Sequence, residues 1–206
     1  MTSVSKKSYT CPVCGANTAI LPMQNHMICP HCRAEHHSSP IDENLMTTPN
    51  PALSSHLFQD IRRLRTYISS ERPLIFAPQP AINNLLHNTD LRVMPLPDTT
   101  QRASHCAPEH EHEHEQGQAI WAGDALLFST ALNDTMHLWS QHLSPGGLLY
   151  MALPILRKHG TTAFQGHEHY RLTNRNIMML LERHGFLLQW RSLRFQPLLR
   201  LIARKV

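Results

Sequence analysis

Beyond the first fifty residues, hydrophobic positions follow two patterns: an apolar stripe with helical spacing, and several short, continuous apolar runs. A helix from Pro51 onward is predicted by apolar residues that recur every three or four positions, namely Leu53, Leu57, Ile61, Leu64 and Ile68. The apolar run over 73–78 is typical of a buried strand. A second strand is predicted over 91–95, with a short helix over 81–87 between the two strands.

The same patterns continue in the second half of the chain. Strands are predicted over 118–122 and 125–129, of which the second is the stronger candidate, and a helix is predicted over 135–143. The segment Ser144-Pro-Gly-Gly147 has the composition of a turn. It leads into an apolar run over 148–153 that predicts a further strand.

The C-terminal part holds one helix and two strands. The helix is predicted over 174–184, with Thr173 as its N-cap and Gly185 ending it. Strands over 186–191 and 198–203 follow as a hairpin. Because strands alternate with helices, the sequence predicts an α/β fold: a Rossmann-like sheet with helices on both faces and an antiparallel edge.

Four cysteines near the N-terminus add a distinct small module. Their pattern is C-x2-C, fourteen residues, C-x2-C, formed by Cys11, Cys14, Cys29 and Cys32. Two such knuckles complete a tetrahedron of thiolates around zinc, and four protein ligands leave no position open for water or substrate. The alternatives are two disulfides or a redox centre, although a redox motif needs only one CxxC. We therefore expect a structural zinc ribbon.

The cysteine module divides the chain into three predicted parts. The zinc ribbon spans 1–42, with a short hairpin expected over 16–28 between the knuckles. A linker rich in Ser, Thr, Asn and Pro follows at 43–51, and the α/β domain spans 52–206. No apolar run reaches the length of a membrane span, and the first ten residues lack the apolar stretch of a secretory signal. Reduced thiols then favour a cytoplasmic location.

Charge is distributed unevenly along the chain. The formal net charge is +4, and the segment 157–206 carries ten Arg or Lys against Glu168 and Glu182. A basic C-terminal face favours a polyanionic partner such as RNA, or an acidic protein, bound through that face or through the ribbon. The alternative is a solvated helix face with no partner.

Histidine is also concentrated in one place. An insertion at 104–116 alternates His with Glu and contains His105, His110, His112 and His114. Imidazoles on one side of an extended segment can bind nickel, zinc or copper loosely. The alternative is a solvated loop of low complexity. Metal handling through these four histidines is therefore one hypothesis for the function.

The last third of the chain resembles the C-terminal half of class I S-adenosylmethionine-dependent methyltransferases. The resemblance rests on the order of six segments: Asp124-Ala-Leu-Leu-Phe-Ser129, Leu143-Ser-Pro-Gly-Gly147, a strand over Leu148 to Pro154, His167-Glu-His-Tyr170, Leu172-Thr-Asn-Arg-Asn-Ile177, and His184-Gly-Phe186. A zinc ribbon in front of such a domain is similar to some rRNA and sugar methyltransferases. The resemblance implies a methyltransferase-type sheet and an S-adenosylmethionine site.

The same resemblance implies roles for particular side chains. Asp98, near the end of the second strand, takes the position of the acid that holds the cofactor ribose. Asp124, at the start of the fourth predicted strand, is the second candidate for cofactor binding. His167 or Tyr170 would lie beside the substrate opening. The catalytic residues themselves are not assigned.

The cofactor loop departs from the family pattern. After the first strand such enzymes carry a glycine-rich loop, because the backbone must approach the cofactor closely and offer free N–H groups. Here the segment 74–81 has no glycine, and Pro78 and Pro80 remove two donors and fix φ. This loop favours a degenerate domain, a pseudoenzyme with a binding or scaffold role. An active methyltransferase with a diverged loop remains the alternative.

Overall fold

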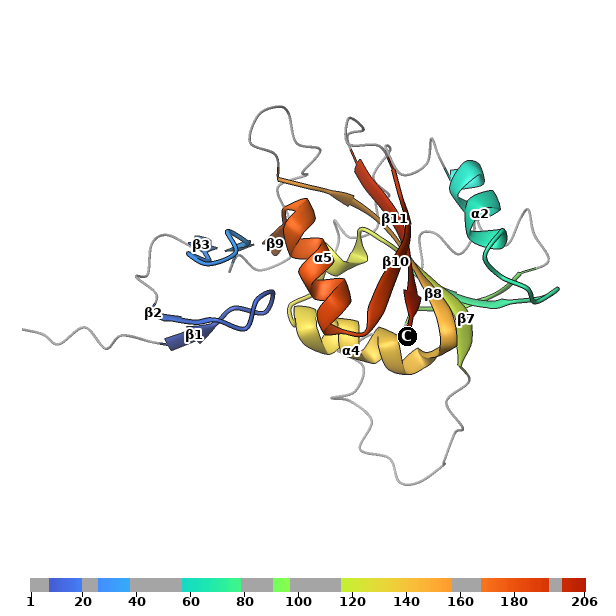
Figure 1. Cartoon of the computed structure of the whole chain (residues 1–206), viewed down its shortest axis with the longest axis horizontal. Coiled ribbons are helices and arrows are strands. Elements are labelled where there is room, and N and C mark those ends of the chain that lie inside the picture. Colours follow the sequence, from blue (N-terminus) through green and yellow to red (C-terminus); the bar gives the residue numbers. More distant parts are fainter. Residues whose placement is uncertain are drawn as a thin grey trace, which may run out of the picture.

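A mixed six-stranded sheet forms the centre of the protein, between helices on both of its faces (Figure 1). The strand order is β10-β11-β8-β7-β5-β6. The computed structural model describes residues 8–19, 26–37, 57–78, 91–96, 116–156, 168–192 and 198–206.

The parallel half of the sheet contains the strands predicted from the apolar runs. β5 (Leu74–Ala77) lies between β6 (Arg92–Pro95) and β7 (Gly117–Gly123), and both pair with it in parallel. β8 (Leu143–Pro154) continues the parallel order beside β7. The carboxyl ends of these strands therefore lie along one edge of the sheet, where α/β folds place their ligands.

The other half of the sheet is antiparallel, as predicted. β11 (Leu198–Lys205) pairs antiparallel with β8, and β10 (Phe186–Arg191) pairs antiparallel with β11 at the sheet margin. Alternate residues of the central strands point to opposite faces, which creates two apolar cores.

Helices cover both faces, as the alternation of elements predicted. α2 (Leu57–Arg65) lies on one face and buries Ile61 and Leu64, two residues of the predicted apolar stripe. α4 (Leu132–His142) and α5 (Asn174–Arg183) lie on the opposite face (Figure 1).

The strand predicted over 125–129 is wrong. β7 ends at Gly123, whose φ of 58° turns the chain away from the sheet. Residues Ala125–Phe128 instead form a 3-10 helix, η3, in which Leu126 and Leu127 are fully buried. A short apolar run has the same composition in a buried strand and in a buried helical turn, so periodicity alone could not separate the two.

The turn predicted at 144–147 lies inside β8, although the sheet register is irregular there. Gly117 pairs with Leu143, whereas the next pair along β7 is Ala119 with Leu148. More residues therefore lie on β8 than on β7 between the two pairs, and the Ser144–Gly147 segment bulges from the ladder. Gly146 has a φ of 74°, which explains why a glycine stands in this bulge.

The N-terminal module consists of two hairpins, each with a cysteine knuckle at its tip. β1 (Ser8–Thr10) pairs with β2 (Asn17–Ala19), and β3 (His26–Ile28) pairs with β4 (Glu35–His37). The hairpin expected over 16–28 is therefore wrong, since each strand pairs across its own knuckle. Each C-x2-C turn reverses the chain by itself, so the two flanking strands are the nearest partners.

The ribbon is joined to the α/β domain by strand pairing. β4 pairs antiparallel with β9 (Tyr170–Arg171), which makes a sheet of order β3-β4-β9. Buried ribbon residues such as Val13 and Ala34 belong to the same apolar core as Leu180 and Leu181 of α5.

Several predictions lie outside the described residues: the linker at 43–51, the helix over 81–87, the His-rich insertion, Asp98 and His167. Among the helices that are described, none is long and apolar enough to cross a membrane.

Candidate functional site

The four predicted cysteine ligands come together between the two ribbon hairpins. Their sulfur atoms all lie within 4.8 Å of one another. The Sγ atoms of Cys11 and Cys32 are 3.7 Å apart, and so are those of Cys14 and Cys29. A disulfide needs about 2.05 Å between its sulfurs, so the four cysteines are free thiols here.

The cluster has the dimensions of a zinc site. With Zn–S bonds of about 2.3 Å, two ligands of a tetrahedron stand about 3.8 Å apart. Three of the four cysteines are buried, and Cys14 is partly exposed. Although burial opposes ionisation, hydrogen bonds from the backbone of Cys32 and His31 lower the pKa of the Cys29 thiol to about 7. These residues fit a structural zinc ion that all four cysteines would hold.

The two knuckles have matching backbone geometry. The N–H of Gly15 donates to the carbonyl of Cys11, and that of Arg33 donates to the carbonyl of Cys29, both at 2.8 Å. Gly15 and Arg33 also share a left-handed conformation, with φ of 72° and 63°. The equivalent turns give the two cysteine pairs the same local geometry, and their four sulfurs come close enough to share one metal ion.

A buried asparagine connects the second knuckle to helix α5. The Asn176 side-chain nitrogen donates to the carbonyl oxygen of Cys32 at 2.9 Å, and Asn176 is fully buried. Its Oδ1 atom accepts from the backbone N–H of Thr173 at 2.8 Å, while Thr173 Oγ1 accepts from the Asn176 N–H. These last two bonds form a capping box, so one side chain serves both the helix start and the ribbon.

The pairing of β4 with β9 is reinforced by histidine and aromatic contacts. The His37 N–H donates to the carbonyl of His169 at 2.7 Å, and the His169 Nδ1 atom lies 3.1 Å from the carbonyl oxygen of His37. His36 stacks on Tyr170 with ring centroids 4.9 Å apart. Burial, followed by the nearby charges of His169 and His37, lowers the pKa of His36. Tyr170, expected beside a substrate opening, is thus buried against the ribbon.

The carboxyl edge of the sheet holds the second predicted site. β5 ends at Ala77, whose carbonyl accepts from the Leu96 N–H at 2.8 Å, and Pro78 follows directly. Asp124 lies at this edge because it follows β7; it was expected at the start of a strand and instead stands after the end of one. Burial raises the pKa of the Asp124 carboxyl to about 6, with a further contribution from Glu168.

His169 links the ribbon to this edge of the sheet, because it contacts both His37 of the ribbon and η3. The His169 N–H donates to the carbonyl of Leu127 at 2.8 Å, three residues after Asp124. Glu168, next to His169, is itself buried. Sequence patterns gave no signal for the roles of Asn176, His36 and His169. Each of these side chains contacts a residue more than 130 positions away, which only the folded chain brings close.

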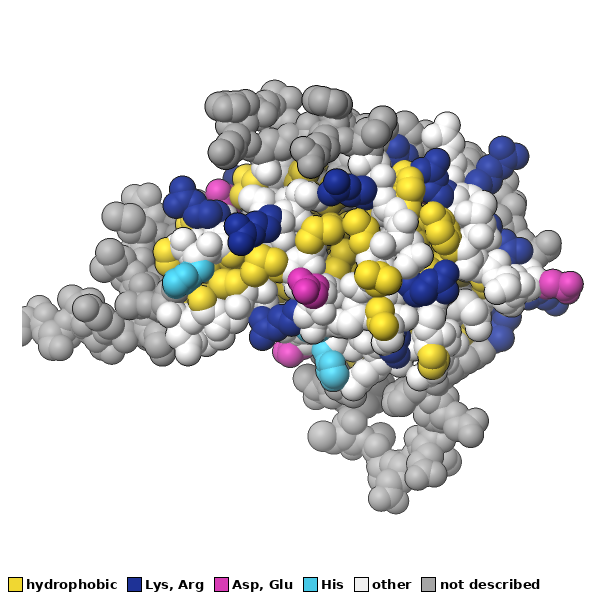
Figure 2. Space-filling view, viewed as in Figure 1, with side chains coloured by type: hydrophobic (Ala, Val, Ile, Leu, Met, Phe, Trp, Pro, Cys, Tyr) yellow, Lys and Arg dark blue, Asp and Glu magenta, His cyan; other side chains and the backbone are white. Residues whose placement is uncertain are grey.

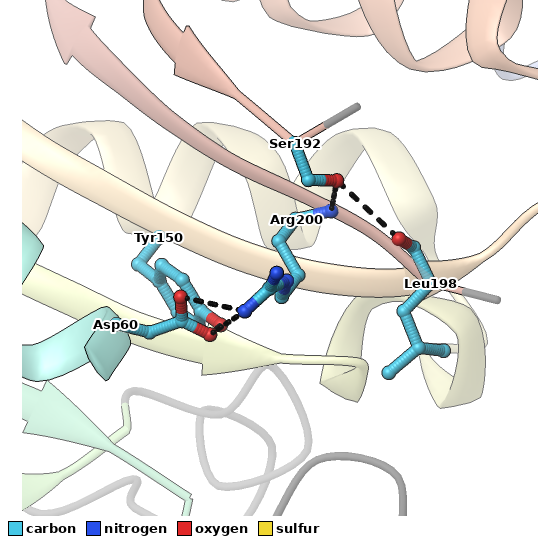
Figure 3. A network of polar contacts seen from close by, with 5 residues as sticks. All are labelled: Asp60, Tyr150, Ser192, Leu198 and Arg200. Atoms are coloured by element: carbon cyan, nitrogen blue, oxygen red, sulfur yellow. Dashed lines mark hydrogen bonds and ion pairs between the residues drawn. The ribbon is translucent and has the colours of Figure 1, made fainter. Parts of the chain in front are cut away.

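A buried polar network lies on the face of the sheet that α2 covers (Figure 3). The Tyr150 hydroxyl donates to the Asp60 carboxylate at 2.6 Å, and Arg200 contacts the same carboxylate. The Arg200 backbone N–H donates to Ser192 Oγ at 3.1 Å. This network fastens α2 onto β8 and β11.

No protein-family model matches this chain, and no curated protein matches it. Solved structures do resemble it. One is a complex between the Haloferax volcanii Trm112 methyltransferase activator and a protein described as a methyltransferase: 11% identity, TM-score 0.53, covering 81% of this chain and 99% of the other. Another is the [4+2]-cyclase SpnF: 14% identity, TM-score 0.51, with coverages of 74% and 80%.

The α/β domain has a fold similar to the methyltransferase-type fold of the Haloferax volcanii complex. At these identities the likeness concerns the fold alone. A further neighbour is an S-adenosylmethionine-dependent methyltransferase from Clostridium acetobutylicum, with 9% identity, a TM-score of 0.48 and coverages of 79% and 94%. The cluster of four cysteines lies in the N-terminal ribbon, and the ribbon packs against the methyltransferase-like domain through the pairing of β4 with β9.

Proposed function

We propose that this protein is a non-catalytic binding protein, in which a zinc ribbon is joined to a methyltransferase-like domain that does not transfer methyl groups. The observation that carries the proposal is the sequence that follows β5. Pro78 follows Ala77 directly, and Pro80 comes two residues later in a segment without glycine. Two amide donors are therefore missing where the cofactor of such a fold needs a close, hydrogen-bonding backbone.

The exposed charges support a binding role. Exposed arginines lie on the second knuckle, at both ends of α5 and at the end of β10: Arg33, Arg175, Arg183 and Arg191. Glu182 is an exposed acid on the same helix. Figure 2 shows Lys and Arg side chains around the junction of the ribbon with α5. Such a surface favours a polyanion such as RNA, or an acidic protein.

The proposal is tested by titrating S-adenosylmethionine into the zinc-loaded full chain in a calorimeter. We expect no binding at micromolar concentrations, and no transfer of a labelled methyl group to RNA, protein or small-molecule extracts. An active class I methyltransferase, measured in the same buffers, is the positive control. Micromolar affinity, or transfer to any of the three extracts, would contradict the proposal.

A second candidate function is an active methyltransferase with a diverged loop, and one observation favours it. The Asp124 carboxyl stands at the carboxyl edge of β7 with a pKa of about 6, in the range where a carboxyl can exchange protons near neutral pH. If methyl transfer is detected, Asp124→Asn should abolish it or flatten its pH dependence. Asp134→Asn, an exposed acid in the first turn of α4, is the matched control.

Metal handling by His105, His110, His112 and His114 is the third hypothesis, and these histidines lie outside the described residues. Deleting 104–115 should then change resistance to nickel, zinc or copper. Unchanged growth on all three metals would remove the basis for this idea.

A further inference from the structure

The ribbon sits on a defined surface of the α/β domain, which we call the ribbon seat. The seat consists of β9 (Tyr170–Arg171), residue His169 before it, and the start of α5 at Asn176. It contacts the second knuckle and β4 of the ribbon. The seat is therefore built from a short edge strand and one helix end, both far from the ribbon in sequence.

Contacts of three chemical kinds hold the ribbon on its seat. Strand pairing places Glu35 opposite Arg171 and His36 opposite Tyr170. The Asn176 amide donates to the carbonyl of Cys32. Apolar packing joins the buried ribbon residues to α5 in one continuous core. Backbone pairing, a buried hydrogen bond and apolar burial together are the usual ingredients of a specific interface.

The key contact depends on the geometry of the metal site. The Cys32 carbonyl belongs to the knuckle whose thiolate binds the metal, so its direction is set by the folded knuckle. The four ribbon strands have three residues each, and hairpins of that length are marginal without further support. Structural zinc supplies that folding free energy, and a ribbon without metal would not present the Cys32 carbonyl or β4.

We propose that the metal-loaded ribbon is a docking module that recognises the ribbon seat by itself, so that it stays bound when the linker is cut. Zinc then controls whether β9 has a strand partner. Because His169 also contacts η3, loss of the ribbon loosens the carboxyl edge next to Asp124. This inference goes beyond the proposed binding function and does not depend on any partner or on methyl transfer.

The test uses the full chain with a protease recognition sequence inserted within 43–51. The zinc-loaded protein is cut and then run on a size-exclusion column. We expect both fragments to elute together with zinc bound, and to separate after chelation. Fragments that separate while zinc is bound, or that stay together after the metal has been removed and its loss verified, would overturn the proposal.

A variant pair tests the assigned contact. Asn176→Asp keeps the oxygen that accepts from Thr173 but replaces the N–H group that donates to Cys32. We expect it to weaken binding of the cut ribbon about tenfold or more, the usual scale of one lost buried hydrogen bond. Asn174→Asp makes the same chemical change at a partly buried side chain on the same helical turn and should leave binding unchanged. Equal affinities for the two variants would contradict the assignment.

Hydrogen exchange on the uncut chain provides a second, independent measurement. Chelation should raise amide exchange in the ribbon and also over 168–184, while α2 on the other face keeps its protection. Changes confined to 8–37 would contradict the docking proposal even if the cut fragments could not be handled in solution.

Discussion

Asp60 and Arg200, 140 positions apart in sequence, form a buried ion pair between α2 and β11. The Arg200 guanidinium donates to the two carboxylate oxygens at 3.0 and 3.2 Å, and Tyr150 donates to one of them at 2.6 Å. This pair explains why one of the C-terminal arginines does not belong to the basic surface. It also predicts a large effect on stability when one partner is removed.

Replacing Asp60 with Ala should destabilise the protein by about 3–5 kcal/mol, because the buried Arg200 guanidinium would lose its ion pair with the Asp60 carboxylate. Denaturant unfolding monitored by Trp fluorescence measures the free energy. Arg62→Ala, at an exposed position on the same helix, should change stability by about 0.5 kcal/mol or less. Similar losses for both variants would show that the effect comes from α2 in general.

Tightly bound zinc should depend on the four cysteines. Cys32→Ser should abolish the bound zinc and lower the melting temperature of the whole chain, since the ribbon shares its core with α5. Metal analysis and calorimetry measure both effects. His31→Ala, exposed and next to Cys32, is the control and should keep its zinc. A separate, unshifted transition for the α/β domain after zinc loss would contradict a shared core.

Stability should depend on pH through Asp124. Its folded pKa of about 6 lies above the ordinary value of 3.8, so the folded protein binds more protons than the unfolded chain between those values. Stability from this group is complete below pH 3.8 and is lost as pH rises through 6. At pH 7 the free energy of unfolding is therefore lower by about 2–3 kcal/mol than at acidic pH, as far as this group is concerned.

Asp124→Asn removes this titration, and the comparison isolates it from other groups. The variant should gain stability relative to the unmodified protein as pH rises from about 4 to about 7, in unfolding curves measured at each pH. Asp134→Asn, at an exposed acid, is the control for replacing a carboxylate with an amide. A constant difference between the Asp124 variant and the unmodified protein across this range would refute the assignment.

Gly185 is required for its backbone conformation and not for space. Its φ is 73°, and no atom lies within 4 Å of the place where a Cβ would stand. Gly185→Ala should therefore cost about 1 kcal/mol from backbone strain alone. Gly185→Asn should cost less, because asparagine tolerates the left-handed region better. Thermal unfolding of the two variants distinguishes this from a steric cause, under which the larger asparagine would be worse.

Short-range patterns predicted much of the fold. Helix α5 was located from its end signals, with Thr173 as N-cap and Gly185 after its end. The same reasoning failed at 125–129, where Leu126 and Leu127 are buried in a 3-10 helix. Burial there depends on Gly123 ending β7 and on the packing of neighbouring elements, which a short apolar run does not encode.

The sequence by itself determined the ligand set of the metal site, because two C-x2-C turns at this spacing bring four thiolates together through local geometry. It also determined the α/β class, through the alternation of apolar patterns. Only the tertiary structure decided that the ribbon docks on β9 and α5 through Asn176, and that Arg200 is buried against Asp60. These contacts join residues more than 130 positions apart, and their free energy depends on burial and direction that exist only once the chain has folded.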